Sequence, residues 1–240
     1  MKSKIQFLLL FISSLTFQSC ELFEKGEKSE LLLHDDFSEE NIQWESVNAD
    51  YYYFQKDFMA FKFERTSLPE PLNTEKPALM LSSFNASDDV FMGAKRKING
   101  LNKNQSYHIT YEITFASNEP EGRVGTGGAP AESVWIKAGA TGFEPLSESS
   151  EEGIFNDFMV LNIDKGNQSV EGENMEIVGN FSNGTRDVYD YRLINHKSKR
   201  GTTVTSNDKG EIWLIFGTES GFESTTTIYY KEVKVFYRPI

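Results

Sequence analysis

The chain has 240 residues, 38% of them hydrophobic, a net charge of −12 at neutral pH and a single cysteine. An acidic excess of this size repels nucleic acid, which is therefore not an expected partner, and it gives no electrostatic attraction to anionic membrane surfaces. One cysteine also excludes a disulfide within the chain.

Residues 1–19 have the pattern of a signal peptide. Lys2 and Lys4 precede an apolar run from Ile5 to Phe17, and the small residue Ser19 follows. A basic start, a short apolar run and a small residue before the cut are typical of secretory leaders. A membrane-spanning helix needs about 20 apolar residues, so this run predicts a cleaved leader and not a span.

Cys20 lies directly after this leader, in the stretch LTFQSC. The stretch resembles the lipobox of bacterial lipoproteins, whose cysteine receives acyl chains such as palmitate and becomes the mature N-terminus. Each buried methylene contributes about 0.8 kcal/mol, so a multiply acylated cysteine gives stable attachment. We therefore expect Cys20 to anchor the protein to a membrane of the bacterial cell envelope, in first place the outer membrane, with the domain outside the cytoplasm.

Residues 20–30 follow as the lipidated cysteine and a polar tether. Loss of the leader removes Lys2 and Lys4 but no acid, which leaves 22 basic and 36 acidic residues and a net charge of −14. From residue 31 to 240 the composition is even, without a long linker or repeat, and this predicts one domain.

Alternation of apolar and polar residues dominates this domain. It is clearest from Tyr107 to Phe115, and strict alternation of this kind predicts a strand with one face in water. Asn99-Gly100, Asn183-Gly184 and similar pairs predict the turns. Further strands are predicted at Tyr51–Gln55, Phe58–Glu64, Ala78–Ser82, Val90–Ile98, Ser133–Ala138, Phe155–Ile163, Val188–Ile194, Ile212–Phe216 and Thr227–Tyr237.

The domain has many short predicted strands, and no segment has apolar residues at the spacing of an amphipathic helix. This predicts an all-β fold, an antiparallel β-sandwich of the jelly-roll kind. In the last strand Ile228 and Tyr230 occupy one parity, whereas Val233 and Val235 occupy the other. A β-bulge at Lys231-Glu232 would restore the facing of these side chains.

The stretch GTGGAPAESVWIKAGAT, residues 125–141, is the strongest candidate for a ligand site. It lacks the spacing of a phosphate-binding loop and leads into a strand, not a helix. Alternation places Val134 and Ile136 in the core and leaves Trp135 and Lys137 on the opposite face, which in a sandwich is the exposed or concave side. An aromatic ring can stack on a sugar ring while a neighbouring polar group bonds the sugar hydroxyls. A glycan is therefore the leading ligand class. The candidate ligand-binding residues are Trp135, Lys137, Glu132 and Tyr52, although a neighbouring loop over Trp135 would explain this residue equally well.

The loop that starts at Asp164 is the candidate metal site. Asp164, Asn167 and Glu173 supply the oxygen ligands that calcium favours, but their spacing does not match an EF-hand loop. A structural calcium is the one metal suggested, and no other cofactor is indicated. The three histidines lie far apart in the sequence, which argues against zinc.

Templates for catalysis are absent from the sequence. Gly217-Thr218-Glu219-Ser220-Gly221 has one residue too many for a nucleophile elbow, and no E-x-D-x-x-E string of the jelly-roll glucanases occurs. An enzyme is therefore the second hypothesis, behind a binding protein, and no catalytic residue is assigned.

Three segments carry a resemblance to a known group: GGAPAESVWIKAGAT from Gly127, IDKGNQSVEGENMEIVGNFSNG from Ile163 and GTESGFESTTTIYY from Gly217. They are similar to segments of secreted and lipid-anchored bacterial β-sandwich proteins without an assigned activity. The opening from Asp35 and the closing strand from Ile228 look, more distantly, like the ends of carbohydrate-binding and concanavalin-like modules. The resemblance implies fold and compartment but no reaction.

The leading hypothesis is thus an envelope lipoprotein whose sandwich binds a glycan. Two alternatives stay open: a hydrolase or lyase that acts on polysaccharide with the same fold, and a structural or partner-binding envelope protein.

Overall fold

The computed structural model describes residues 30–86, 88–150 and 157–240. The predicted leader at 1–19, the predicted lipidation site Cys20 and the tether up to residue 29 lie outside the described residues. None of the helices in the described part of the chain is long and apolar enough to cross a membrane.

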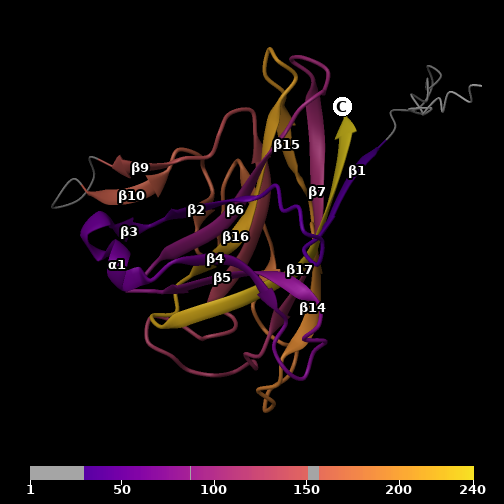
Figure 1. Ribbon diagram of the computed structural model, residues 1–240. Helices are drawn as coiled ribbons and strands as arrows, with labels where there is room; N and C mark the ends of the chain where they lie inside the picture. Colours follow the sequence, from indigo (N-terminus) through magenta and orange to yellow (C-terminus); the bar gives the residue numbers. More distant parts are fainter. Residues whose placement is uncertain (1–29, 87, 151–156) are drawn as a thin grey trace, which may run out of the picture.

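The fold consists of two antiparallel sheets packed face to face (Figure 1), as the sequence predicts. The larger sheet has seven strands around the long C-terminal strand, which pairs with three neighbours. Its strands in path order are β14 (Arg192–Lys197), β7 (Ser106–Ser117), β17 (Thr225–Pro239), β5 (Pro77–Phe84) and β4 (Lys62–Ser67), with β1 (Leu31–Asp36) on β17 and β15 (Thr202–Thr205) on β7.

The second sheet has five strands, in the order β13 (Met175–Asn180), β8 (Val134–Thr141), β16 (Ile212–Ser220), β6 (Val90–Ile98) and β2 (Glu45–Ala49). Alternate residues of both sheets point between the layers and form the main core. On β8 these are Val134, Ile136, Ala138 and Ala140, and on β7 they are Tyr107, Ile109, Tyr111, Ile113 and Phe115.

A small lobe covers the other face of the five-stranded sheet and lies beside it in Figure 1. It contains β3 (Tyr51–Tyr52), the 3-10 turn Tyr53–Gln55, α1 (Lys56–Met59), β9 (Ser147–Ser150) and β10 (Phe158–Leu161), followed by the hairpin of β11 (Gly166–Asn167) and β12 (Val170–Glu171). Leu161 and Ile163 of the lobe pack on Val47, Phe91 and Ile215 of the sheet, so this face carries a second core.

Most predicted strands exist, with shifted ends. The strand predicted at Tyr51–Gln55 is wrong beyond Tyr52, since the chain turns there into two short helical turns. The strand predicted at Val188–Ile194 begins only at Arg192. The bulge predicted at Lys231-Glu232 is confirmed, because the register of β17 on β7 shifts between Tyr230 and Glu232.

Candidate functional site

A cavity of about 370 Å³ lies between the small lobe and the five-stranded sheet. We call it the acidic pocket. Its lining combines carboxylates and a lysine with apolar side chains of the lobe. Its lining residues are Asp50, Asp89, Phe158, Val160, Leu161, Ile163, Asp164, Lys165, Gly166 and Asn167.

Five charged side chains from five separate segments meet at the base of this pocket. Asp50 lies between β2 and β3, Asp89 directly before β6, Lys137 on β8, Lys165 directly before β11, and Glu219 near the end of β16. Asp50 takes a left-handed backbone conformation with φ of 63°, which aspartate tolerates better than most residues. Its N–H donates to the carbonyl oxygen of Met159 at 2.6 Å and so joins this turn to β10.

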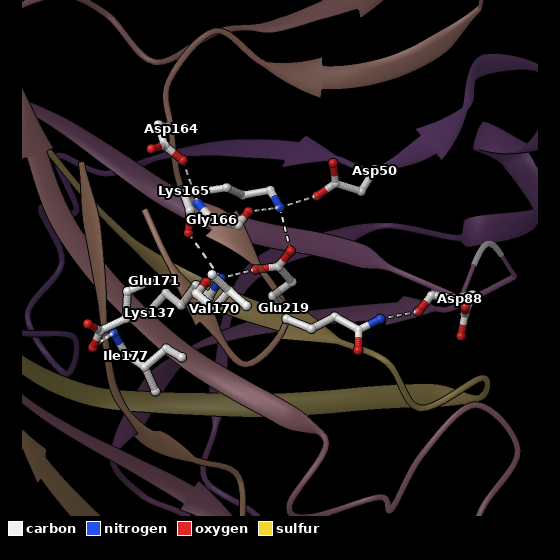
Figure 2. A network of polar contacts seen from close by, with 11 residues as sticks. Asp50, Asp88, Lys137, Asp164, Lys165, Gly166, Val170, Glu171, Ile177 and Glu219 are labelled. Carbon is white, nitrogen blue, oxygen red and sulfur yellow. Dashed lines mark hydrogen bonds and ion pairs between the residues drawn. The ribbon is translucent and has the colours of Figure 1, made fainter. Parts of the chain in front are cut away.

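Lys165 lies between Asp50 and Glu219 in Figure 2, which shows its ammonium group directed at both carboxylates. Its Nζ is 2.8 Å from Oδ2 of Asp50 and forms an ion pair with Oε1 of Glu219. Lys137 forms an ion pair with the other oxygen of Glu219, and its Nζ also donates to the carbonyl oxygens of Lys165 and Val170, each at 3.0 Å. We call these four residues and Asp89 the ion network.

Burial controls the protonation of the ion network. Burial, and then the negative charges of Glu219 and Asp50, raise the pKa of Asp89 to about 8. Burial also raises the pKa of Asp50 to about 6, although Lys165 opposes this shift. Three carboxylates face two ammonium groups, so one proton on Asp89 balances the charge at neutral pH. The pocket thereby contains a neutral carboxyl group that can both donate and accept hydrogen bonds.

Aromatic rings form a ledge at the edge of the acidic pocket. Tyr52 and Phe158 are neighbours across β3 and β10, with ring centroids 5.1 Å apart in an edge-to-face arrangement. Phe54 stacks on Tyr52 at 5.6 Å and leaves 65% of its surface exposed. We call these three residues the aromatic ledge. It continues the apolar wall of the pocket onto the surface of the lobe.

The prediction that Lys137 lies on an open face is wrong. Lys137 lies on the predicted side of β8, but its side chain is fully buried because the β11–β12 hairpin covers it. Trp135 is partly buried on the same face, and its register partners are Glu219 and Asn180. Its role in ligand binding stays a prediction.

The two other predicted ligand residues have separate positions. Tyr52 belongs to the aromatic ledge, beside the acidic pocket. Glu132 lies on the loop before β8, and its carboxylate accepts a hydrogen bond from the N–H of Gly122 at 2.6 Å. The structure therefore brings Lys137 close to the pocket and places Tyr52 at its edge, and it gives Glu132 a contact that holds the glycine-rich loop.

In the predicted calcium loop, the carboxylate of Asp164 accepts hydrogen bonds from the backbone of the loop itself. One oxygen of Asp164 accepts the N–H of Gly166, and the other accepts the N–H of Glu173, both at 2.9 Å. These two backbone bonds lower the pKa of Asp164. The carboxylate thus stabilises the β11–β12 hairpin, while Asn167 and Glu173 are exposed.

Within the described residues, one group of acids comes close enough for a shared cation. Oxygen atoms of Asp50, Asp89 and Glu219 lie within 4.8 Å of one another. The ammonium group of Lys165 is bonded to two of these three carboxylates. It supplies the positive charge that a metal ion would bring, so the group needs no metal for its charge balance.

No protein-family model matches the chain, and no curated protein matches it in sequence. Several solved structures are similar in backbone. The family 11 carbohydrate-binding module of a cellulosomal cellulase from Clostridium thermocellum has 11% identity and a TM-score of 0.40, with 88% of this chain and 95% of that chain covered. The mannan-recognising module TmCBM27 has 12% identity and a TM-score of 0.39, with 88% and 98% covered.

A third similar structure is the K1 cleaved adhesin domain of Lys-gingipain from Porphyromonas gingivalis W83. It has 10% identity and a TM-score of 0.36, with 85% of this chain and 97% of that chain covered. Identities this low carry no residue-to-residue correspondence, so the function has to come from the side chains of this chain.

Proposed function

We propose that the protein is an envelope lipoprotein whose sandwich binds a glycan in the acidic pocket. One observation carries this proposal: carboxyl groups and Phe158 of the aromatic ledge line the same cavity of about 370 Å³. Sites for small ligands combine apolar walls with a few well-placed polar groups. A sugar ring offers both an apolar face for an aromatic ring and hydroxyl groups for carboxyl oxygens.

The ion network favours a neutral ligand over a charged one. The proton of the neutral Asp89 carboxyl lies in a hydrogen bond with Glu219, and the carboxyl keeps the capacity to accept a hydrogen bond from a sugar hydroxyl group. The paired lysines already balance the carboxylates, so the lining formed by the described residues offers no free cation to attract a uronic acid. The chain's overall acidity works against such a ligand as well. We therefore expect a neutral oligosaccharide.

A glycan array probed with the full-length protein in mild detergent tests this proposal. We expect retention of neutral glycans, and a loss of about tenfold or more in affinity for Phe158→Ala, because a ring in a binding site contributes on the order of 1 to 2 kcal/mol. The control is Phe143→Ala, since Phe143 is an exposed phenylalanine in the turn after β8, outside the pocket lining. Retention that survives Phe158→Ala unchanged would contradict the proposed site.

Envelope attachment is the second part of the proposal, and the sequence around Cys20 supports it. Metabolic labelling with palmitate tests it in cells that express the wild type or Cys20→Ser. We expect label and membrane fractionation for the wild type, and neither for the variant. A labelled variant would place the acyl chain elsewhere.

A hydrolase is the second candidate function, and the close approach of three carboxylates favours it. Asp89, with its pKa raised to about 8, has the protonation of a general acid. Glu219, however, is fully buried and paired with both lysines, so it is not free to attack a sugar. Release of reducing ends from a retained glycan, abolished by Asp89→Asn, would establish this function. Retention without release assigns binding alone.

A further inference from the structure

A second cavity of about 170 Å³ lies away from the acidic pocket, where β17 begins and β13 ends. The two cavities share no lining residue. Rings and a proline line part of the second cavity, and hydroxyl, amide and carboxyl groups line the rest. The lining residues are Asn118, Glu119, Pro130, Phe181, Tyr191, Phe222, Thr225, Thr226 and Thr227.

The glycine-rich loop that the sequence singles out builds one wall of this second cavity. Pro130 of this loop and Phe222 both line the cavity. A Cβ atom at Gly125 would lie 2.4 Å from the ring of Phe222, and one at Gly127 would lie 2.3 Å from the carbonyl oxygen of Gly221. Only glycine allows so close an approach. The glycines therefore press the loop against Phe222 and fix this ring in the wall.

Glu119 is the one acid in this lining, and it is partly buried. Its backbone N–H and carbonyl bond to Ser117 and Asn183, but its carboxylate forms no hydrogen bond or ion pair with any residue of the described ranges. Burial alone raises the pKa of this carboxyl, and no cation counteracts the shift. A partly buried carboxylate without a partner is costly unless a ligand or water satisfies it.

The neighbouring polar groups are also available to a ligand. Asn118, Thr225 and Thr226 use none of their side-chain oxygen or nitrogen atoms in hydrogen bonds among the residues described. The ring of Tyr191 packs edge to face on Tyr229 with centroids 5.7 Å apart, which fixes the second aromatic wall. The cavity therefore offers one strong acceptor, several groups that both donate and accept, and two immobilised rings.

We propose that this second cavity is a separate binding site for a single neutral sugar ring, with the Glu119 carboxylate as acceptor for two of its hydroxyl groups. The volume suits one ring and no more. Phe222 and Tyr191 contact its apolar face, while Asn118 and the threonines bond its remaining hydroxyl groups. A sugar that carries its own carboxylate is excluded, because the unpaired charge of Glu119 repels it.

Saturation-transfer difference NMR on the full-length protein in mild detergent tests this inference. The probes are glucose, galactose, mannose, fucose and N-acetylglucosamine, with glucuronate as the charged counterpart. One ring makes few contacts, so we expect a dissociation constant on the order of 1 mM for at least one neutral probe. Glucuronate should give no signal.

Two variants locate the signal at the second cavity. Glu119→Gln keeps the shape but removes the charged acceptor, and we expect binding roughly tenfold weaker because hydrogen bonds to charged groups are the stronger ones. Thr225→Val, at an exposed position, should also weaken binding. It replaces Glu119→Gln as the test if that variant does not fold. The matched control is Glu223→Gln, which changes an exposed acid outside the lining. No signal from any neutral probe, or a signal that both cavity variants leave unchanged, would overturn the inference.

The same spectra separate this site from the proposed glycan site. Phe158→Ala changes only the acidic pocket, so it should leave the monosaccharide signal intact. A signal lost in Phe158→Ala but kept in Glu119→Gln would assign the monosaccharide to the acidic pocket and overturn the second site. The array could retain no glycan while the monosaccharide still gives an NMR signal that Glu119→Gln weakens. This result would overturn the proposed function but not the second site.

Discussion

Lys137 connects the five-stranded sheet to the hairpin that covers it. Its ammonium group donates to two carbonyl oxygens around the β11–β12 hairpin and pairs with Glu219. Every one of these groups would lose a partner without the ammonium, and buried groups left without a partner are strongly destabilising.

Replacement of Lys137 by methionine should therefore lower stability far more than a surface substitution does. Methionine has a similar length but leaves part of the Glu219 charge uncompensated, which costs about 3 to 5 kcal/mol or a fall in Tm on the order of 10 °C. Thermal unfolding followed by circular dichroism measures this. The control is Lys197→Met, whose ion pair with Glu112 is exposed and contributes less than about 1 kcal/mol. Equal effects of both variants would show that the ion network does not stabilise the fold.

Asp89 makes the stability depend on pH. Its pKa is about 8 in the folded protein, against about 3.9 in the unfolded chain. Between these values the folded state binds more protons than the unfolded chain. The contribution of Asp89 to the free energy of unfolding is therefore complete below about pH 4 and is lost as the pH rises to about 8. We expect Tm to fall between about pH 5.5 and about pH 8.5, and this fall to be smaller by about 5 °C in Asp89→Asn.

Asp187→Asn is the control for this pH series, because 91% of its side chain is exposed. Asp50, whose pKa is about 6, also titrates in this range, so the difference between the wild type and Asp89→Asn is the quantity that reports on Asp89. Parallel pH profiles for the wild type and Asp89→Asn would contradict the raised pKa of Asp89.

The sequence points to Lys137 of the ion network but not to its partners. Asp50 and Glu219 are 169 positions apart, and no motif spacing connects them. Alternation correctly gives the side of β8 on which Lys137 lies, but it carries no information on what covers that side. Glu219 and Trp135 share a row only through the register of β16 on β8, and the sequence does not reveal register between distant strands.

At the scale of elements, strands with a clear alternating or continuous apolar run were predictable, and short or polar strands such as β15 were not. The alternation from Tyr107 to Phe115 lies within β7, which is apolar on its core side only. β13 escapes prediction because Glu176, Gly179 and Asn180 interrupt its short apolar run, although Met175 to Val178 are all buried between the main core and the lobe. Tyr51–Gln55 reads as a strand because tyrosine and phenylalanine favour strands, although the exposed Tyr53 and Phe54 are in a helical turn.

The β11–β12 hairpin depends on Asp164 in particular. Alanine at this position removes both bonds of the carboxylate to the N–H groups of Gly166 and Glu173. We expect local opening to become easier by about 1 to 2 kcal/mol, and amide exchange of these two N–H groups to accelerate about tenfold. Hydrogen exchange read by NMR measures this, with Asn167→Ala in the same hairpin as control. Unchanged exchange in Asp164→Ala would show that the loop is held by other contacts.

At the scale of the molecule, the sandwich is a support on which a lobe and a loop create two cavities. The main core fills the space between the sheets, and the lobe builds a smaller core on the outer face of one sheet. The acidic pocket forms where this lobe stops covering the sheet, and the second cavity forms where the glycine-rich loop meets the start of β17. Both cavities therefore arise from connections, which are the parts of a fold that carry function most often.

The location of a bound glycan tests the central claim most directly. A crystal structure of the full-length protein soaked with its strongest array ligand gives this location. We predict a sugar ring against Phe158 with its hydroxyl groups within hydrogen-bond distance of Asp89. A glycan seated over Trp135, or a bound glycan that leaves the aromatic ledge and the ion network empty, would contradict the account.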